Sequence, residues 1–233
     1  MKIYDATTSR QLPSLPRCGV IYEFAHKDYS TSPPSLGHCL YPTGDRSIMP
    51  TADRIAYAAE PLLADASDPC HLIVLDDESR QTENLWSNTR HLTEQQLEAN
   101  RDHYARLLDN ARVGIPGMRL GLYGVATPGY AHSEGFKDAG VEAFASRLGY
   151  DRLPDGSFGS VGVIEGADFV CPVGYCRSSD EDFGEWRRRM VKTVAFCRRW
   201  HRQIVLFISP SFSPKHAIPC PWFADCLAWI NDQ

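Results

Sequence analysis

The sequence predicts an α/β fold and, within that class, a TIM-type (β/α) barrel. Short apolar runs alternate with longer amphipathic segments, which is the pattern of βα units around a mainly parallel sheet. The run His71–Leu75 is apolar after its first residue, as expected of a strand that is buried on both faces. Polar and aromatic residues follow several of these runs, where the strands of such a barrel carry their functional groups.

Length and composition favour one domain. The chain has 233 residues, of which 43% are hydrophobic and 11% aromatic, enough for one large core. We therefore expect a single barrel domain over residues 1–233, with residues 1–17 as an extended N-terminal segment. The net charge is −5 and the basic residues are mostly scattered, so we expect no nucleic-acid partner. No apolar run has the roughly 20 residues of a membrane span, and the N-terminus lacks the apolar stretch of a secretory signal. We expect a soluble protein, cytoplasmic by default.

The first half of the chain contains two clear strands and one clear helix. The run Cys18–Phe24 is the first expected strand, and an irregular second strand is expected at Leu36–Tyr41. A helix is expected over Thr51–Ala64, whose first residue has an N-cap side chain. The strand His71–Leu75 follows, and then a polar segment, Ser79–His91, that is long for a βα loop. Long loops inside compact domains are usually functional.

The second half begins with a well-marked helix. Thr93 and Gln96 have the spacing of a capping box, and Gly114 ends the apolar stripe that follows. The remaining expected elements are the strands Met118–Val125, Asp168–Tyr175 (with regular pairing stopping near Pro172) and Gln203–Ile208, a strand or loop at Val161–Ile164, and the helices Val141–Leu148, Phe183–His201 and Pro221–Ile230. These make six or seven strands, whereas the barrel closes with eight. The barrel is therefore irregular or incomplete, or one strand is not apparent in the sequence.

The eight cysteines favour reduced thiols in the core. Several lie in apolar strand or helix patterns, where a thiol behaves as a small hydrophobe. The pairs Cys171/Cys176 and Cys220/Cys226 lack the spacing of a structural zinc site. Disulfides in an exported form are the alternative. No Gly-rich phosphate loop follows a strand, so we expect no cofactor, and no Gly-x-Ser-x-Gly elbow of a serine hydrolase is present. No second cluster of ligands joins Asp76 and Glu78, so we expect no metal.

Candidate functional residues lie at the expected strand ends. The run Asp76-Asp77-Glu78 follows the clearest strand. Asp76 and Glu78 are two residues apart and project to the same face, with Cα atoms about 6.5 Å apart, whereas Asp77 points to the other face as a helix-packing or supporting residue. Two carboxylates this close repel each other, which raises one pKa and suits a general acid. Asp76 and Glu78 are the expected catalytic residues. The expected substrate-binding residues are Tyr22, Glu23, Trp86, Tyr123 and Tyr175, with Trp86 as a stacking platform for a sugar ring.

Structural explanations of the same residues stay open. Strand-end carboxylates also cap the following helix or pair with a nearby arginine such as Arg80 or Arg90. Tyrosines at strand ends also pack at the edge of a core, and Glu23 and His26 are more often structural than catalytic.

The run Ile73–Glu78, with Trp86 downstream, resembles the Asp-x-Glu strand of the hyaluronidase-like barrel glycosidases. The segment Ala167–Tyr175 and the segment Gln203–Phe212 are similar to later strands of that family. The resemblance implies that Glu78 is the general acid, that Asp76 assists the substrate's N-acetyl group, and that Tyr175 hydrogen-bonds this group. This is substrate-assisted catalysis without an enzyme nucleophile. The family's disulfide pattern and last strand have no counterpart here, and the barrel lysozymes, which share the acid pair, fit nearly as well.

The sequence thus predicts a glycoside hydrolase that cleaves a polysaccharide or oligosaccharide containing N-acetylhexosamine. Two alternatives remain open. One is a carbohydrate-binding barrel that has no catalytic activity. The other is a metal-dependent hydrolase that uses Asp76, Glu78 and a histidine such as His26.

Overall fold

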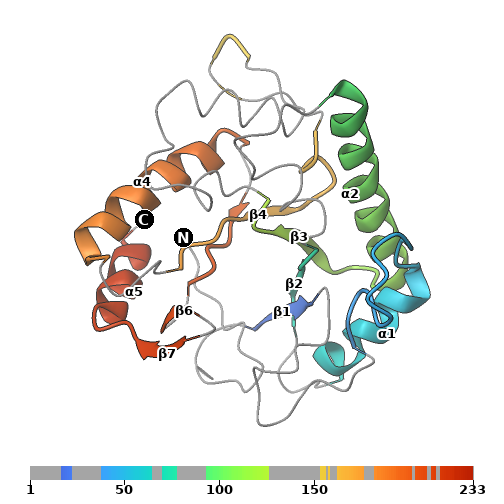
Figure 1. Cartoon of the computed structure of the whole chain (residues 1–233), viewed down its shortest axis with the longest axis horizontal. Helices are drawn as coiled ribbons and strands as arrows, with labels where there is room; N and C mark the ends of the chain where they lie inside the picture. Colours follow the sequence, from blue (N-terminus) through green and yellow to red (C-terminus); the bar gives the residue numbers. More distant parts are fainter. Residues whose placement is uncertain are drawn as a thin grey trace.

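Five parallel strands form the central sheet, and they lie side by side in the order in which they occur along the chain (Figure 1). The computed structural model describes residues 17–22, 38–64, 70–77, 93–125, 153–155, 157, 162–175, 181–200, 203–208, 211–213 and 216–232. The five strands are β1 (Cys18–Ile21), β2 (Leu72–Leu75), β3 (Arg119–Tyr123), β4 (Phe169–Cys171) and β5 (Gln203–Ile204). Every neighbouring pair is parallel, so all five carboxyl ends meet at one edge.

Four helices are described: α1 (Ala52–Leu63), α2 (Glu94–Gly114), α4 (Phe183–Arg198) and α5 (Phe223–Asn231). Side chains cap the first turns of α1, α2 and α4, because Thr51, Thr93 and Asp182 each accept a hydrogen bond from a backbone N–H. At α2 the capping box is complete, since the side chain of Gln96 accepts from the backbone N–H of Thr93 at 2.9 Å. These local signals explain why the helices begin where the sequence predicts.

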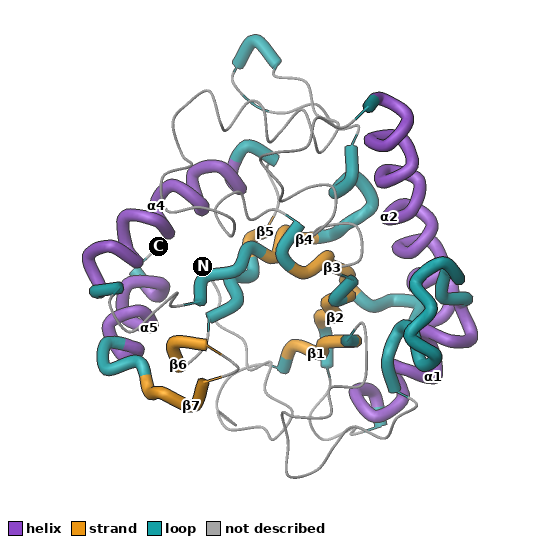
Figure 2. The backbone as a smooth tube through the Cα atoms, in the orientation of Figure 1, coloured by secondary structure: helices purple, strands orange, loops and turns teal. Residues whose placement is uncertain are grey.

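The two faces of the sheet are buried by different partners. At alternate strand positions, side chains such as Ile73, Leu75 and Leu122 pack into one large core with the four helices. Figure 2 shows these helices around the outside of the strands. Side chains of the opposite parity form a second group, which we call the inner cluster, on what we call the inner face. The inner cluster consists of Cys18, Leu72, Val74, Tyr123, Phe169, Cys171, Val173 and Val205, with Val20, Tyr175 and Phe207 packed against it.

The α/β class is confirmed, and several element predictions need correction. Among the residues predicted as a strand at Leu36–Tyr41, those described form a bend, in which the N–H of Leu40 donates to the carbonyl of Tyr22 at 2.8 Å. Residues 163–166 form a turn. The strand expected at Gln203–Ile208 pairs regularly only over β5, followed by one isolated bridge between Val173 and Phe207. The predicted helix Val141–Leu148 and residues 1–16 lie outside the described residues.

A short antiparallel pair, which the sequence did not predict as strands, follows the sheet. It consists of β6 (Ser211–Ser213) and β7 (His216–Pro219), and it leads into α5. The five-stranded parallel sheet is not closed into a barrel by the strands that the structure describes. No described helix combines the length and the apolar character that a membrane span requires.

Candidate functional site

The two aspartates after β2 point to opposite faces of the sheet. Leu72 and Val74 belong to the inner cluster, whereas Ile73 and Leu75 pack into the core with the helices. Strand alternation therefore directs Asp76 to the inner face and Asp77 to the helices. The hydrogen bonds that the Asp77 carboxylate accepts from Tyr41 and His103, on the helix side, agree with this direction. The predicted packing of Asp77 against a helix is confirmed by its contact with His103, and the direction of Asp76 follows from strand alternation.

Asp76 lies in one row with two tyrosines across the carboxyl ends of three strands. Ile21 is paired with Leu75, and Leu75 with Leu122. Tyr22, Asp76 and Tyr123 each come one residue later on their strands. The N–H of Asp76 continues the ladder by donating to the carbonyl of Ile21 at 2.9 Å. Residues in register on a parallel sheet share a face, so this row places one carboxyl between two phenol side chains.

The charge of Asp76 acts on Tyr22. Burial raises the pKa of the Tyr22 hydroxyl to about 12, and the negative charge of Asp76 contributes in the same direction. Tyr22 therefore stays protonated at neutral pH and keeps its O–H as a hydrogen-bond donor beside a carboxylate. Asp76 itself is 9% exposed. A partly desolvated carboxylate beside neutral donors is suited to bind hydroxyl or amide groups.

Aromatic side chains continue this surface beyond the ends of β4 and β5. The ring of Tyr123 meets Phe207 edge-on, with ring centroids 5.5 Å apart, and Tyr175 packs against the same inner cluster. The side chains of Tyr22, Asp76, Tyr123, Tyr175 and Phe207 thus belong to one face, at the carboxyl ends of consecutive strands. We call these five residues the inner-face site.

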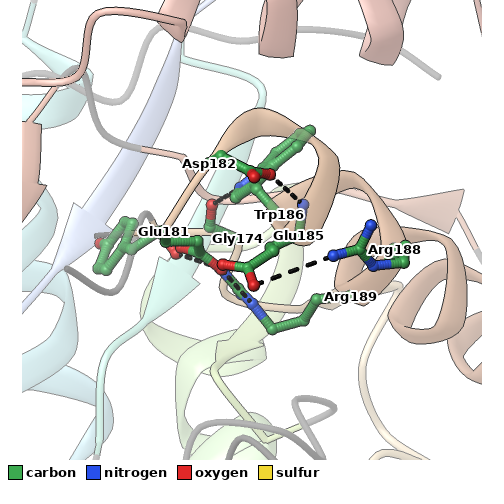
Figure 3. A network of polar contacts seen from close by, with 8 residues as sticks. Gly174, Glu181, Asp182, Glu185, Trp186, Arg188 and Arg189 are labelled. Carbon is green, nitrogen blue, oxygen red and sulfur yellow. Dashed lines mark hydrogen bonds and ion pairs between the residues drawn. The ribbon is translucent and has the colours of Figure 1, made fainter. Parts of the chain in front are cut away.

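The backbone at Tyr175 is held from α4. The indole N–H of Trp186 donates to the carbonyl of Gly174 at 2.7 Å, and Arg189 donates to the carbonyl of Tyr175 at 2.8 Å. Arg189 also forms a largely buried ion pair with Glu181, with a shortest N···O distance of 2.8 Å (Figure 3). These contacts fix the chain at the point where β4 has ended, and they explain how an irregular segment presents Tyr175 in a defined place.

On the helix side, Asp77 is the centre of a buried polar group. Its Oδ2 atom accepts hydrogen bonds from the hydroxyl of Tyr41 and from Nε2 of His103, both at 2.7 Å. The hydroxyl of Tyr104 donates to the main-chain carbonyl of Asp77 at 3.1 Å. We call Tyr41, Asp77, His103 and Tyr104 the Asp77 cluster. The sequence predicted only that Asp77 supports or packs against a helix. The position of His103 one residue before Tyr104, on the apolar stripe of α2, is the signal that could have identified its partner.

The structure brings together only part of the predicted site. Tyr22, Asp76, Tyr123 and Tyr175 share the inner face, and Phe207 joins them although the sequence did not single it out. Alternation along Gln203–Ile208 could have indicated Phe207, since Val205 and Phe207 lie on one face. The predicted residues Glu23, Glu78 and Trp86 lie outside the described residues, as do His26, Arg80 and Arg90.

Other candidate sites have weaker support. Within the described ranges, His, Cys, Asp and Glu side chains form no group of three or more that could hold a metal ion. The metal-dependent alternative relies on Glu78 and His26, so it stays a prediction. A groove of about 540 Å³ runs between the outer side of α2 and the turn at 162–166. Charged α2 residues such as Arg101 and Asp102 line it, and it opens on the helix layer, away from the inner face.

Comparisons of the chain with protein-family models, with curated proteins and with solved structures find no match. The resemblance to hyaluronidase-like barrels and to barrel lysozymes therefore stays a sequence-based prediction.

Proposed function

We propose that this protein is a glycoside hydrolase that acts on a polysaccharide containing N-acetylhexosamine. The observation that best supports the proposal is the row formed by Tyr22, Asp76 and Tyr123. A carboxylate flanked by tyrosines suits a sugar, because sugars offer hydroxyl groups for hydrogen bonds and apolar C–H faces for contact with rings. In barrels built from βα units the active site lies at the carboxyl ends of the strands, which is where this row lies.

We also propose that the parallel sheet is part of a (β/α) barrel, irregular or incomplete. Two features support this. The strands follow one another across the sheet in chain order, without the reversal of a doubly wound sheet, and the four described helices pack on one face. Successive right-handed crossovers in one direction put their helices on one side, which leaves the other face to become the interior of a barrel.

In this proposal Glu78 is the general acid and Asp76 is its partner. Strand alternation predicts that Glu78 projects to the same side as Asp76. Glu78 would protonate the leaving glycosidic oxygen. The carboxylate of Asp76 would orient the N-acetyl group, whose carbonyl oxygen attacks the anomeric carbon, and the hydroxyl of Tyr175 would hydrogen-bond that group. Water, activated by the Glu78 carboxylate, would then attack the anomeric carbon, break its bond to the N-acetyl oxygen and return a proton to Glu78. The two displacements together retain the anomeric configuration without a covalent bond to the protein.

The direct test is the variant Glu78→Gln, which keeps the shape of the side chain and removes its proton. With chito-oligosaccharides, hyaluronan fragments and peptidoglycan as substrates, we expect release of reducing ends to fall by about 10²- to 10⁴-fold. Binding of the same sugars should change little. Asp76→Asn should also lower turnover.

The matched control is Glu98→Gln, which makes the same change at an exposed position on α2. Its turnover should equal that of the wild type. Undiminished activity of Glu78→Gln on a substrate that the wild type cleaves would overturn the assignment of the acid.

A sugar-binding protein without catalysis is the second candidate. It is favoured by the composition of the inner-face site, in which one carboxylate, Asp76, stands among four aromatic residues. Such a site binds a sugar without a second acid. Saturable binding of chito-oligosaccharide or hyaluronan fragments, with no reducing ends released during long incubation, would support this candidate. Product release that depends on Glu78 would exclude it.

A further inference from the structure

The Asp77 cluster lies directly behind the inner-face site, on the opposite side of the same strand end. Asp77 follows Asp76 in the chain, and its carboxylate accepts from Tyr41 and His103 at 2.7 Å each. A carboxylate accepts hydrogen bonds, and Nε2 of His103, 2.7 Å away, is its donor in the tautomer that carries a proton on Nε2. The cluster joins three segments: the loop at 38–41, the end of β2 and the first half of α2.

Burial makes these contacts strong. Asp77 is 0% exposed and His103 4%, so their hydrogen bonds form in surroundings that water does not screen. Charge-assisted hydrogen bonds in such surroundings are short and directional, and a buried carboxylate that loses one donor is strongly destabilised. The main-chain carbonyl of Asp77 is held as well, by the hydroxyl of Tyr104. The backbone after β2 therefore has a defined course beyond its last paired residue.

This course determines where the carboxylate of Asp76 points. The backbone N–H of Asp76 donates to the carbonyl of Ile21 on the β1 side, and the next residue, Asp77, is held by His103 on α2. A strand end that is held on both sides has little freedom to rotate. The two carboxylates are consecutive residues of opposite parity, so a shift of Asp77 toward or away from α2 tilts Asp76 relative to Tyr22 and Tyr123.

We propose that the His103–Asp77 pair, together with Tyr41, positions Asp76 within the inner-face site. His103 contacts Asp77 and stacks edge-on against Tyr104, both on the helix side, so it is a positioning residue and not a catalytic one. The inference deepens the proposed function, because it rests on Asp76 being the carboxylate of that site. A change on α2 then alters sugar binding on the opposite face of the sheet.

The test compares two variants of His103 that differ in whether the side chain can donate a hydrogen bond to Asp77. In His103→Gln the side-chain amide reaches about as far as Nε2 and still donates to Asp77. His103→Met has similar volume and helix propensity and cannot donate. The reporters are Tyr22 and Tyr123, labelled with 3-fluorotyrosine and assigned with Tyr22→Phe and Tyr123→Phe. Leu107→Ala, a change at a buried apolar position on α2, is the control for loss of stability alone.

We expect His103→Met to shift the fluorine resonances of Tyr22 and Tyr123 and to weaken chito-oligosaccharide binding by about tenfold or more. His103→Gln should keep both properties close to wild type, and Leu107→Ala should leave the two resonances in place. If His103→Met does not fold, Tyr41→Phe provides the second test, since it removes one donor to Asp77 with little change in shape. In Tyr41→Phe the fluorine resonances of Tyr22 and Tyr123 should move in the same direction as in His103→Met, by a smaller amount.

The outcomes separate this proposal from the proposed function. Unchanged Tyr22 and Tyr123 resonances in folded His103→Met or Tyr41→Phe, or equal shifts in Leu107→Ala, would show that the cluster is only a core contact. If the Tyr22 and Tyr123 resonances shift in these variants, and the wild-type protein neither binds nor cleaves any tested sugar, the positioning role is supported and the proposed function is overturned.

Discussion

Asp76 and Asp77 are chemically identical neighbours, and the sheet gives them different surroundings. Asp77 is fully enclosed and shares its Oδ2 atom between a histidine and a tyrosine. Asp76 is directed to the face where Tyr22, Tyr123 and Tyr175 gather. The carboxylate of Asp77 binds Tyr41 and His103 on the helix side, whereas that of Asp76 lies on the inner face with tyrosine hydroxyls and rings. This difference is why we place the chemistry at Asp76.

The charge of Asp76 provides a prediction for Tyr22. The Tyr22 pKa is raised to about 12, first by burial and then by Asp76. Asp76→Asn removes the negative charge and leaves Tyr22 buried. We therefore expect the pKa of Tyr22 to fall from about 12 and to stay above the usual value of 10.0. Tyrosinate absorbance, with Tyr22→Phe as the reference, measures it. An unchanged pKa would show that the two side chains do not interact.

The same shift predicts how stability changes at alkaline pH. Below pH 10.0 Tyr22 is protonated in both the folded and the unfolded chain. Above that value the unfolded chain loses the proton first, so the folded state loses stability until the pH reaches about 12. The free energy of unfolding of Tyr22→Phe should therefore fall less than that of the wild type in this window. Denaturant titrations at several pH values test this, and equal losses would contradict it.

At the scale of the elements, the inner face is closely packed one layer below the row that contains Asp76. A Cβ atom added at Gly121 on β3 would lie 2.3 Å from Cε2 of Phe169 and 2.8 Å from Sγ of Cys171. Gly121 is paired with Phe169 on β4, so the absence of a side chain at Gly121 allows the aromatic ring to lie across the strand. The ring of Phe169 thus packs on the inner face one layer below Tyr123.

Gly121→Ala should lower the free energy of unfolding by about 1–3 kcal/mol, because the methyl group would force the Phe169 ring out of its position. The measurement is the midpoint of a denaturant titration. Gly19→Ala on β1 is the matched control: its added Cβ would lie 2.9 Å from the end of the flexible Leu62 side chain, which can move, and 3.0 Å from Sγ of Cys70, so its contacts are less close than those at Gly121. A cost for Gly121→Ala no larger than that of Gly19→Ala would contradict the close packing of the inner face.

At the scale of the whole molecule, the seven described cysteines are buried thiols on both sides of the sheet: Cys18, Cys39, Cys70, Cys171, Cys197, Cys220 and Cys226. Burial raises the pKa of Cys18, Cys171 and Cys197 above the usual value. Since the thiolate is the reactive form, these thiols are protected both by enclosure and by protonation. The predicted role of cysteines as small hydrophobes agrees with this.

The cysteines report on global unfolding. We expect that in Cys176→Ser, which removes the one cysteine outside the described residues, a disulfide reagent modifies the native protein slowly at neutral pH. Denaturant should accelerate the reaction by a factor of about a thousand or more, because access requires unfolding of the core. Quantification of released thiol follows the reaction. A thiol that reacts in native Cys176→Ser as fast as in the unfolded chain would contradict the burial.

The sequence by itself determined the α/β class, the capped starts of α1 and α2, and the opposite directions of Asp76 and Asp77. Each depends on local rules, namely the strand period of two, the helical stripe and the side chains that cap a first turn. Only the tertiary structure decided the order of the strands, the end of regular pairing in β5, the row of Tyr22, Asp76 and Tyr123, and the pairing of Asp77 with His103. These features depend on contacts between distant segments (Asp77 and His103 are 26 residues apart), and local patterns do not specify which segments meet.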